Sequence, residues 1–236
     1  MIGAFPFITL KSFPSGYTPY GKIKKLLRED YYNSLIKIND SQIEDIALYM
    51  NGVKLKEKLF ETLSWGLFFN PIPELEIYFL CERDENRHNF SVVYSRNSIV
   101  VPTEDVYAFT FMYILILSKI AEGELSTNLS EIPKKFVSLN NFIKGKYQQN
   151  IKNFYKNLSF IEPKVLNRFP NVFYKKEKDG VVIFLYKILD DLFIKFKIGK
   201  EKDIAVTEKS LNLHGKEIVF TFIGLILNAF RRERLK

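Results

Sequence analysis

Cysteine and histidine are scarce in this sequence: one cysteine and two histidines occur among 236 residues. A single cysteine excludes a disulfide framework, a zinc finger with several cysteine ligands and a cysteine-ligated iron–sulfur cluster. Chains without disulfides are typical of reducing compartments. The first residues, MIGAFPF, lack the basic and apolar regions of a signal peptide, so we expect a cytoplasmic protein.

Motifs of the common enzyme classes are also missing. The chain contains no G-x-x-x-x-G-K-[ST], G-x-G-x-x-G, G-x-S-x-G or H-E-x-x-H. Nucleotide hydrolysis, dinucleotide cofactors, α/β-hydrolase chemistry and zinc proteolysis therefore lack support, and the sequence identifies no cofactor. No internal repeat or low-complexity tract is evident either.

No apolar run is long enough for a typical membrane span. The longest, residues 106–121, is shorter than the roughly twenty residues that a transmembrane helix needs. Glu104 and Asp105 precede it, and Lys119 lies near its end. We therefore expect a buried core helix and no membrane partner.

Positive charge is in excess. Lysine and arginine number 35 and aspartate and glutamate 27, which gives a net charge of +8 and a pI near 9.3. Such a charge suggests a nucleic-acid partner. The basic residues are spread along the chain, however, and we prefer the explanation that they cover solvated helix and strand faces. The abundance of Lys, Ile, Phe and Tyr also suits a thermophilic source.

The most distinctive sequence lies in residues 65–117, which hold the only tryptophan and the only cysteine. Aromatic and branched residues at 67–69 and 75–80 predict two strands, and the prolines between them predict a rigid elbow. Residues 81–89 read as a polar loop, and residues 90–94 as a further strand.

A long helix should follow these strands. The sequence Pro-Thr-Glu-Asp at 102–105 predicts its start, because threonine caps free N–H groups and carboxylates favour the positive end of the helix dipole. The helix should stop near Gly123. Since it is apolar almost all round, it should be buried.

The remaining segments alternate between helical and strand patterns. The predicted elements are a strand at 3–13, helices at 22–38 and 41–50, a strand at 54–69, a helix at 141–157, a short helix or turn pair at 158–169, strands at 172–176, 181–188, 193–198 and 204–207, and a helix at 216–230. Together they predict an α+β fold, a mainly antiparallel sheet packed by helices around a single core with adjacent termini. We expect one domain over residues 1–236, in which 124–154 connects 1–123 to 155–236.

Acidic residues form the first candidate site. Glu82, Asp84 and Glu85 of the polar loop could converge with Glu104 and Asp105 to bind a divalent metal or to act as acid and base. The alternative, which we prefer, is a solvated turn paired with nearby arginines, together with carboxylates that stabilise a helix start.

Three further side chains could take part in chemistry. His88 in the loop and His214 before the last helix could each be a metal ligand or a general base, but a surface or capping role is favoured because no H-x-x-x-H spacing occurs. Cys81 would be reactive if Arg83 lowered its pKa. A buried cysteine that acts as a small hydrophobic residue is the preferred explanation.

The order Pro-x-Pro, strand, Asp-Glu, strand, Pro-Thr-Glu-Asp and apolar helix resembles an uncharacterised prokaryotic family, a domain of unknown function numbered thirty-seven eighty-six. Asp84 and Glu85 stand at the family's acidic turn, where Asn86 replaces the usual third acid, and residues 102–105 stand at its helix start. The resemblance implies no established activity. Members of the family occur in anaerobes, sometimes beside iron–sulfur or corrinoid-type modules, which implies an accessory role.

The second half of the chain resembles the opening half of the same family. Residues 158–163 stand at the family's entry motif and residues 216–230 at its leucine-rich helix, and the turn that follows in the family resembles residues 13–17. The resemblance thus covers 3–117 and 155–230 in swapped order.

This swapped order implies a circular permutation. In that case Phe230 should end near Gly3, because permutation is tolerated where the original ends lie close together. The strands within 55–94 and 172–198 should then share one core.

Three functions are consistent with these observations. The first is a cytoplasmic accessory or binding protein for a protein or small-molecule partner, without catalytic machinery. The second is a basic nucleic-acid-binding protein. The third is a metal-dependent enzyme that uses the acidic loop. Because catalytic motifs are missing, we favour the first.

Overall fold

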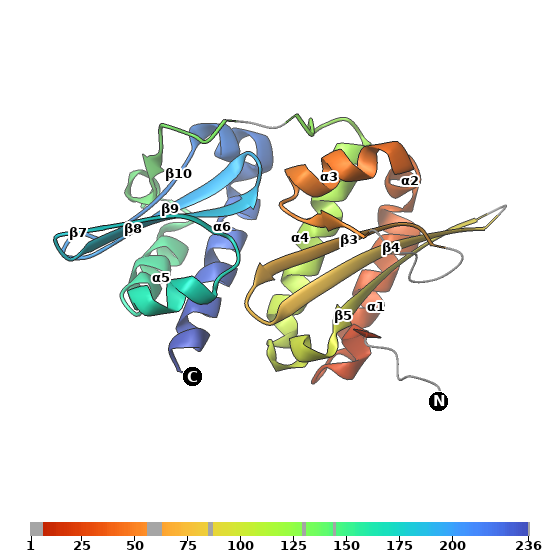
Figure 1. Ribbon diagram of the computed structural model, residues 1–236, viewed down its shortest axis with the longest axis horizontal. Helices are drawn as coiled ribbons and strands as arrows, with labels where there is room; N and C mark the ends of the chain where they lie inside the picture. Colours follow the sequence, from red (N-terminus) through yellow and green to blue (C-terminus); the bar gives the residue numbers. More distant parts are fainter. Residues whose placement is uncertain (1–6, 56–62, 85–86, 129–130, 144, 236) are drawn as a thin grey trace. The chain divides into compact units, whose positions relative to one another are not determined.

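The computed structural model describes residues 7–55, 63–84, 87–128, 131–143 and 145–235. The chain divides into two compact units, residues 1–128 and residues 129–236. Each unit packs helices against its own antiparallel sheet, so the predicted α+β fold is confirmed (Figure 1).

The two units differ from the single core that we expected. In each unit the last strand of the meander returns to pair with the first strand, which completes the sheet within that unit. The boundary after residue 128 falls inside the predicted connector, 124–154. Gly3 lies outside the described residues, so the closeness of Phe230 to Gly3 stays a prediction.

Unit 1 begins with a short strand and several helices, continues with an antiparallel meander and ends with a long helix. Its elements are β1 (Phe7–Ile8), η1 (Leu10–Ser12), α1 (Tyr17–Lys25), η2 (Leu26–Asp30), α2 (Tyr32–Leu35), η3 (Asp40–Gln42), α3 (Ile43–Tyr49), β2 (Val53–Lys54), β3 (Leu63–Ile72), β4 (Leu75–Asp84), β5 (Arg87–Ser95), η4 (Arg96–Val100) and α4 (Thr103–Ala121). The strand order is β1-β5-β4-β3-β2. The predicted central helix is confirmed as α4.

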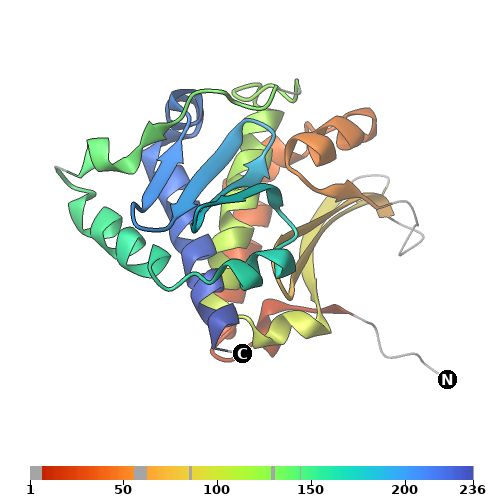
Figure 2. The same ribbon diagram turned by 60° about the vertical axis from the view of Figure 1, so that its left-hand side comes forward.

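The core of unit 1 forms where α4 packs against one face of this sheet (Figures 1 and 2). The Tyr113 ring of α4 stacks on Phe69 of β3, with ring centroids 4.5 Å apart. A hydrogen bond of 2.8 Å between the hydroxyl groups of Tyr94 and Thr110 joins β5 to the same helix. Both α1 and α2 pack against α4 as well.

The polar loop predicted at residues 81–89 is instead part of a β-hairpin. β4 continues to Asp84, and the register with β5 runs without a shift to the pair Asp84–Arg87. The polar sequence suggested a loop, but cross-strand polar pairs such as Glu82 and Asn89 are compatible with strands whose side chains reach solvent.

The predicted elbow between β3 and β4 is a tight turn at Pro73 and Glu74, preceded by a register shift between Phe69 and Ile72. Pro71 lies at this irregularity, where a missing backbone N–H is tolerated.

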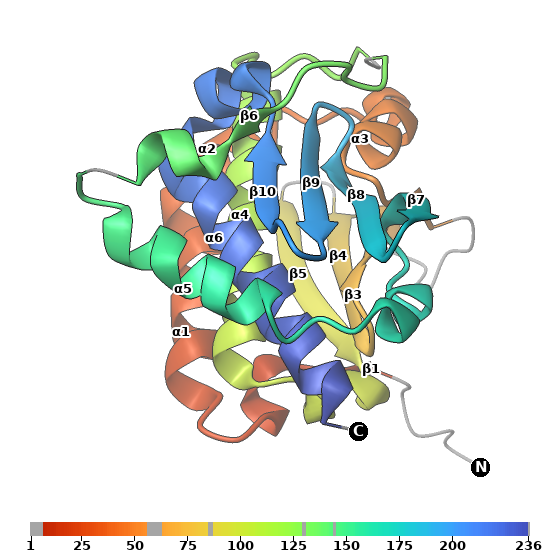
Figure 3. The same ribbon diagram turned by 90° about the vertical axis from the view of Figure 1, so that its left-hand side faces the viewer.

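Unit 2 follows the same plan with fewer helices. Its elements are β6 (Val137–Ser138), η5 (Leu139–Phe142), α5 (Gln148–Leu158), η6 (Pro163–Arg168), β7 (Val172–Lys178), β8 (Val181–Leu189), β9 (Leu192–Ile198), β10 (Asp203–Val206) and α6 (Glu208–Arg234). The strand order is β6-β10-β9-β8-β7, as Figure 3 shows. The four predicted strands of this half are confirmed.

Phe230 of α6 is the centre of an aromatic cluster in the core of unit 2. Its ring centroid lies 3.9 Å from that of Phe169, 5.6 Å from Phe184 and 6.2 Å from Phe196. By length and hydropathy α6 could cross a membrane, but 61% of its most apolar window is buried in the structure. Burial of this kind is also found in the core helices of globular domains, so the helix gives only weak support to a membrane span.

The two units have the same topology, which reveals an internal repeat that we did not recognise in the sequence. In both, a two-residue strand is followed by helices, a four-stranded meander and a long helix, and the first strand pairs with the last strand of the meander. Two sequence segments match across the units. They are FITLKSFPSG at 7–16 with FVSLNNFIKG at 136–145, and FTFMYILI at 109–116 with FTFIGLIL at 220–227.

Equivalent side-chain contacts accompany these matches. The Ser98 hydroxyl accepts a hydrogen bond of 3.0 Å from the Glu76 N–H, and the Ser210 hydroxyl donates one of 2.6 Å to the Asp191 carbonyl. In unit 1 the serine ties the chain after the meander to the start of β4, and in unit 2 it ties that chain to the turn that precedes β9. In both units a serine thus joins the chain after the meander to the region where the third strand of the meander begins.

Candidate functional site

The carboxylates expected to converge lie apart. The Glu76 N–H, at the start of β4, bonds to Ser98 of η4, which leads into α4. Glu104 and Asp105 begin α4, whereas Asp84 lies at the far end of the ten-residue strand β4. Glu85 lies outside the described residues. Within the part of the chain that the structure describes, no group of three His, Cys, Asp or Glu residues could hold a metal ion.

The structure also defines the surroundings of Arg83, Cys81 and His214. Arg83 pairs with Asp40 at 3.1 Å and donates to the Ile38 carbonyl. Burial raises the pKa of the Cys81 thiol to about 12, an effect that outweighs the opposing influence of Arg83. Cys81 is therefore a protonated core residue, as preferred from the sequence.

His214 is buried, and its Nε2 lies 2.8 Å from an Asp191 carboxylate oxygen. Because Asp191 lies in the β8–β9 turn and His214 in the first segment of α6, the pair ties the hairpin to this segment of the helix. Gly215 follows with φ of 79° and breaks the helical geometry there. We assign this buried pair a structural role.

One predicted site residue, His88, does lie in a cavity. Its ring is parallel to that of Phe90, with centroids 6.4 Å apart. A cavity of about 430 Å³ is lined by Leu27, Arg28, Tyr32, Arg87, His88, Asn89 and Phe90. Its walls therefore come from helical residues of unit 1 on one side and from strand β5 on the other.

A second cavity continues along the same strand. It has a volume of about 110 Å³, and the residues that line it are Thr9, Leu10, Tyr20, Ile23, Lys24, Leu27, Arg28 and the β5 segment 89–94. The two cavities share Leu27, Arg28, Asn89 and Phe90. We call the combined feature the β5 groove.

Strand β5 forms the floor of this groove, and most of one edge of this strand is not paired with another described strand. β5 pairs with β4 from Arg87 to Tyr94, but on its other side β1 pairs only with Tyr94 and Ser95. Among the described strands, residues 87–93 of β5 thus have a neighbour on one side only. Every second residue of such a strand directs its N–H and C=O groups toward the open side.

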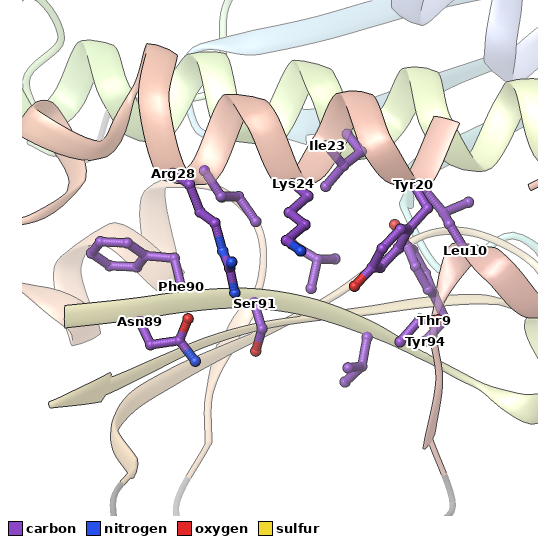
Figure 4. Close-up of a pocket in the computed structure, with 13 residues that line it drawn as sticks. Thr9, Leu10, Tyr20, Ile23, Lys24, Arg28, Asn89, Phe90, Ser91 and Tyr94 are labelled. Atoms are coloured by element: carbon purple, nitrogen blue, oxygen red, sulfur yellow. The ribbon is translucent and has the colours of Figure 1, made fainter. Parts of the chain in front are cut away.

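Helix α1 and its continuation η2 form the facing wall. Tyr20, Lys24 and Arg28 recur at spacings of four residues and therefore lie on one face of the helical segment. Figure 4 shows all three side chains extending from the helix toward β5. Lys24 and Arg28 are exposed, whereas Ile23 and Leu27 beside them are buried.

The groove is positively charged. Neither cavity has an aspartate or glutamate among its described lining residues, whereas Lys24, Arg28 and Arg87 all line it. No salt bridge within the described segments neutralises Lys24 or Arg28, and Arg87 faces Asp84 in the ladder. The helical stripe at 22–38 is evident in the sequence, but the groove is not, because nothing in the sequence identifies β5 as an edge strand.

Comparisons with protein-family models, with curated proteins and with solved structures return no match for this chain. The resemblance to the domain-of-unknown-function family therefore stays a prediction.

Proposed function

We propose that the chain is a binding protein whose unit 1 takes an anionic partner in the β5 groove. The observation that supports this proposal is the pair Lys24 and Arg28, directed into a cavity whose described lining contains no acidic residue. Lys24 and Arg28 are exposed in the free protein, and their attraction to an anionic partner would strengthen as the partner excludes water from the groove. The apolar walls at Ile23, Leu27 and Phe90 add area that a ligand can cover.

A purely structural role for the two cations is the competing explanation. Charged side chains beside an open strand edge discourage the edge from pairing with other chains. In that case removal of the charges would promote aggregation but would abolish no binding. A binding measurement separates the two explanations.

The test uses fluorescein-labelled deca-glutamate as an anionic probe and fluorescence anisotropy as the readout. Lys24→Glu with Arg28→Glu should weaken binding at least tenfold. Lys22→Glu with Lys25→Glu is the matched control, because it changes the net charge equally on the same helix but at residues that do not line either cavity. Equal losses in both variants would show that net charge acts without the groove, and the proposal would fail.

A nucleic-acid function is the second candidate, and a cleft in unit 2 favours it. This cleft has a volume of about 520 Å³ and is lined by Asn153, Lys156, Asn157, Phe160, Arg231, Arg234 and Leu235. The Arg234 guanidinium lies over the Phe160 ring at 5.7 Å, an arrangement suited to stacking.

The same basic residues have a structural explanation, because Lys156 and Arg234 lie in the last turns of α5 and α6. Cations stabilise helix C-termini there. We therefore rank this function second. A cytoplasmic location, expected from the sequence, is part of the proposal as well.

A further inference from the structure

We infer that the β5 groove binds an extended acidic peptide segment, which adds to the sheet of unit 1 as a strand beside β5. This inference rests on the proposed function and specifies the class of partner. It combines an open strand edge, a cationic helical wall and a comparison between the two units.

The open edge supplies the backbone recognition. The unpaired side of residues 87–93 of β5 has the length of a strand of about seven residues, roughly 24 Å at about 3.4 Å per residue. β1 shows that this side of β5 accepts an antiparallel strand, because it pairs there with Tyr94 and Ser95. The chain then leaves the sheet at η1, and no described strand occupies the position beyond, where η2 lies near β5. Strand addition to such an edge is a general mode of peptide recognition.

Unit 2 shows what closes the equivalent position. Ile8 pairs with Tyr94 and the matching Val137 pairs with Val206, so Val92 in β5 corresponds to Ile204 in β10. The Tyr155 hydroxyl lies 3.5 Å from the Ile204 N–H and donates a hydrogen bond of 2.9 Å to the Asp203 carboxylate.

In unit 2 a tyrosine from the neighbouring helix α5 thus covers the edge. In unit 1 the corresponding helical wall carries Lys24 and Arg28 and leaves the cavity open. The equivalence also indicates that the Val92 N–H points into the groove, as the Ile204 N–H points toward Tyr155.

Charge selects the occupant. A second copy of the chain, paired through the same edge, would bring Lys24 and Arg28 of one copy toward those of the other, and like charges repel. An acidic strand places alternate side chains on the face where these cations lie. A single-stranded nucleic acid would also meet positive charge, but it offers no backbone N–H and C=O groups in strand register and leaves the edge unused.

The test compares heptapeptides of equal charge against the full chain by isothermal titration calorimetry. The probe is acetyl-Glu-Val-Glu-Val-Glu-Val-Glu-amide. Two derivatives carry N-methyl groups on either the three valine amides or the four glutamate amides, and each thereby loses the N–H donors of one strand edge. We expect one derivative to bind at least tenfold more weakly than the parent and the other to bind within threefold of it. A heptamer of deoxythymidine is the nucleic-acid probe.

Hydrogen exchange followed by NMR gives a second readout that needs no variant. Peptide binding should slow exchange at the Val92 amide and at alternate residues of β5. The inference is overturned if both N-methylated derivatives bind as well as the parent, if no β5 amide gains protection, or if only the oligonucleotide binds.

Failure of the inference remains distinguishable from failure of the proposed function. If all the acidic peptides bind equally and this binding is lost in Lys24→Glu with Arg28→Glu, the groove binds anions but no strand is added to β5. If the double variant binds the peptides as well as the wild type does, both the inference and the proposed function are refuted.

Discussion

The Tyr155 hydroxyl provides the most direct test of how unit 2 closes its strand edge, and Tyr155→Phe removes that hydroxyl with little change in shape. The lost interaction is a hydrogen bond of 2.9 Å to the Asp203 carboxylate, together with a long contact of 3.5 Å to the Ile204 N–H. Hydrogen bonds to charged groups contribute about 1.5–3 kcal/mol. Both side chains are half-buried, and Asp203 keeps a hydrogen bond from Ser138. We therefore expect the variant to lose about 1–2 kcal/mol in the free energy of unfolding.

Urea denaturation followed by far-UV circular dichroism measures this loss. Tyr147→Phe is the control, since Tyr147 also donates from its hydroxyl to a carboxylate, that of Glu217, but in an exposed pair. Exposed pairs contribute little, so the control should lose clearly less stability than Tyr155→Phe. A Tyr155→Phe loss no larger than that of the control would refute the account of the closed edge.

The effect should also depend on pH in a defined direction. Burial raises the pKa of the Tyr155 phenol above its usual value near 10. The folded state therefore holds this proton more tightly than the unfolded chain does. The stabilisation is complete below pH 10 and is lost as the pH rises through the folded-state pKa, so the difference in stability between the wild type and Tyr155→Phe should shrink at alkaline pH.

Two further predictions concern Cys81 and the cleft of unit 2. At pH 8, Cys81 should react with an aromatic disulfide reagent at least a hundredfold more slowly in the folded protein than in urea, because burial covers the thiol and raises its pKa to about 12; similar rates would contradict its place in the core. If the cleft binds nucleic acid, Lys156→Glu with Arg231→Glu should weaken binding of a twelve-residue oligothymidine at least tenfold and flatten its salt dependence. Lys175→Glu with Lys176→Glu on β7 is the control of equal charge, and an equal loss there would remove the cleft from consideration.

The parts of the fold that could be predicted are those with strong local patterns. The apolar helix α4, the strands of residues 172–206 and the turn at Asp179 and Gly180 all follow from hydrophobic spacing and turn residues, and both turn residues have positive φ as such turns require. The prediction of a loop at residues 81–89, where the β4–β5 hairpin ends, was wrong because polar side chains such as these are also typical of loops. Pairing across the hairpin, as between Asp84 and Arg87, holds these residues in strands, and the polar character of the segment does not indicate such pairing.

The candidate site was harder to predict, for a different reason. His88 was the one proposed residue that lines the groove, and the carboxylates named beside it lie elsewhere or outside the described residues. In the sequence, Lys24 and Arg28 are part of an ordinary basic stripe on a helix. Only the strand order shows that β5 lies at an edge of the sheet, opposite these two residues. Strand order is a property of the whole sheet, whereas periodicity reports only on single elements.

The internal repeat bears on the circular permutation that we predicted from the family resemblance. A strand, turn and apolar helix occur in both units with the same topology. A duplicated unit presents similar segments twice along the chain, so the predicted swap of the two halves does not require a permutation. Both units have a long helix after the meander and a serine that contacts the region where the third strand of the meander begins. The units differ at the edge beside their first strand, where unit 2 presents Tyr155 and unit 1 presents Lys24 and Arg28 over an open groove. When two copies of a fold keep their core contacts and diverge at one edge, that edge is where a separate function would arise, and in this chain it is the edge of β5.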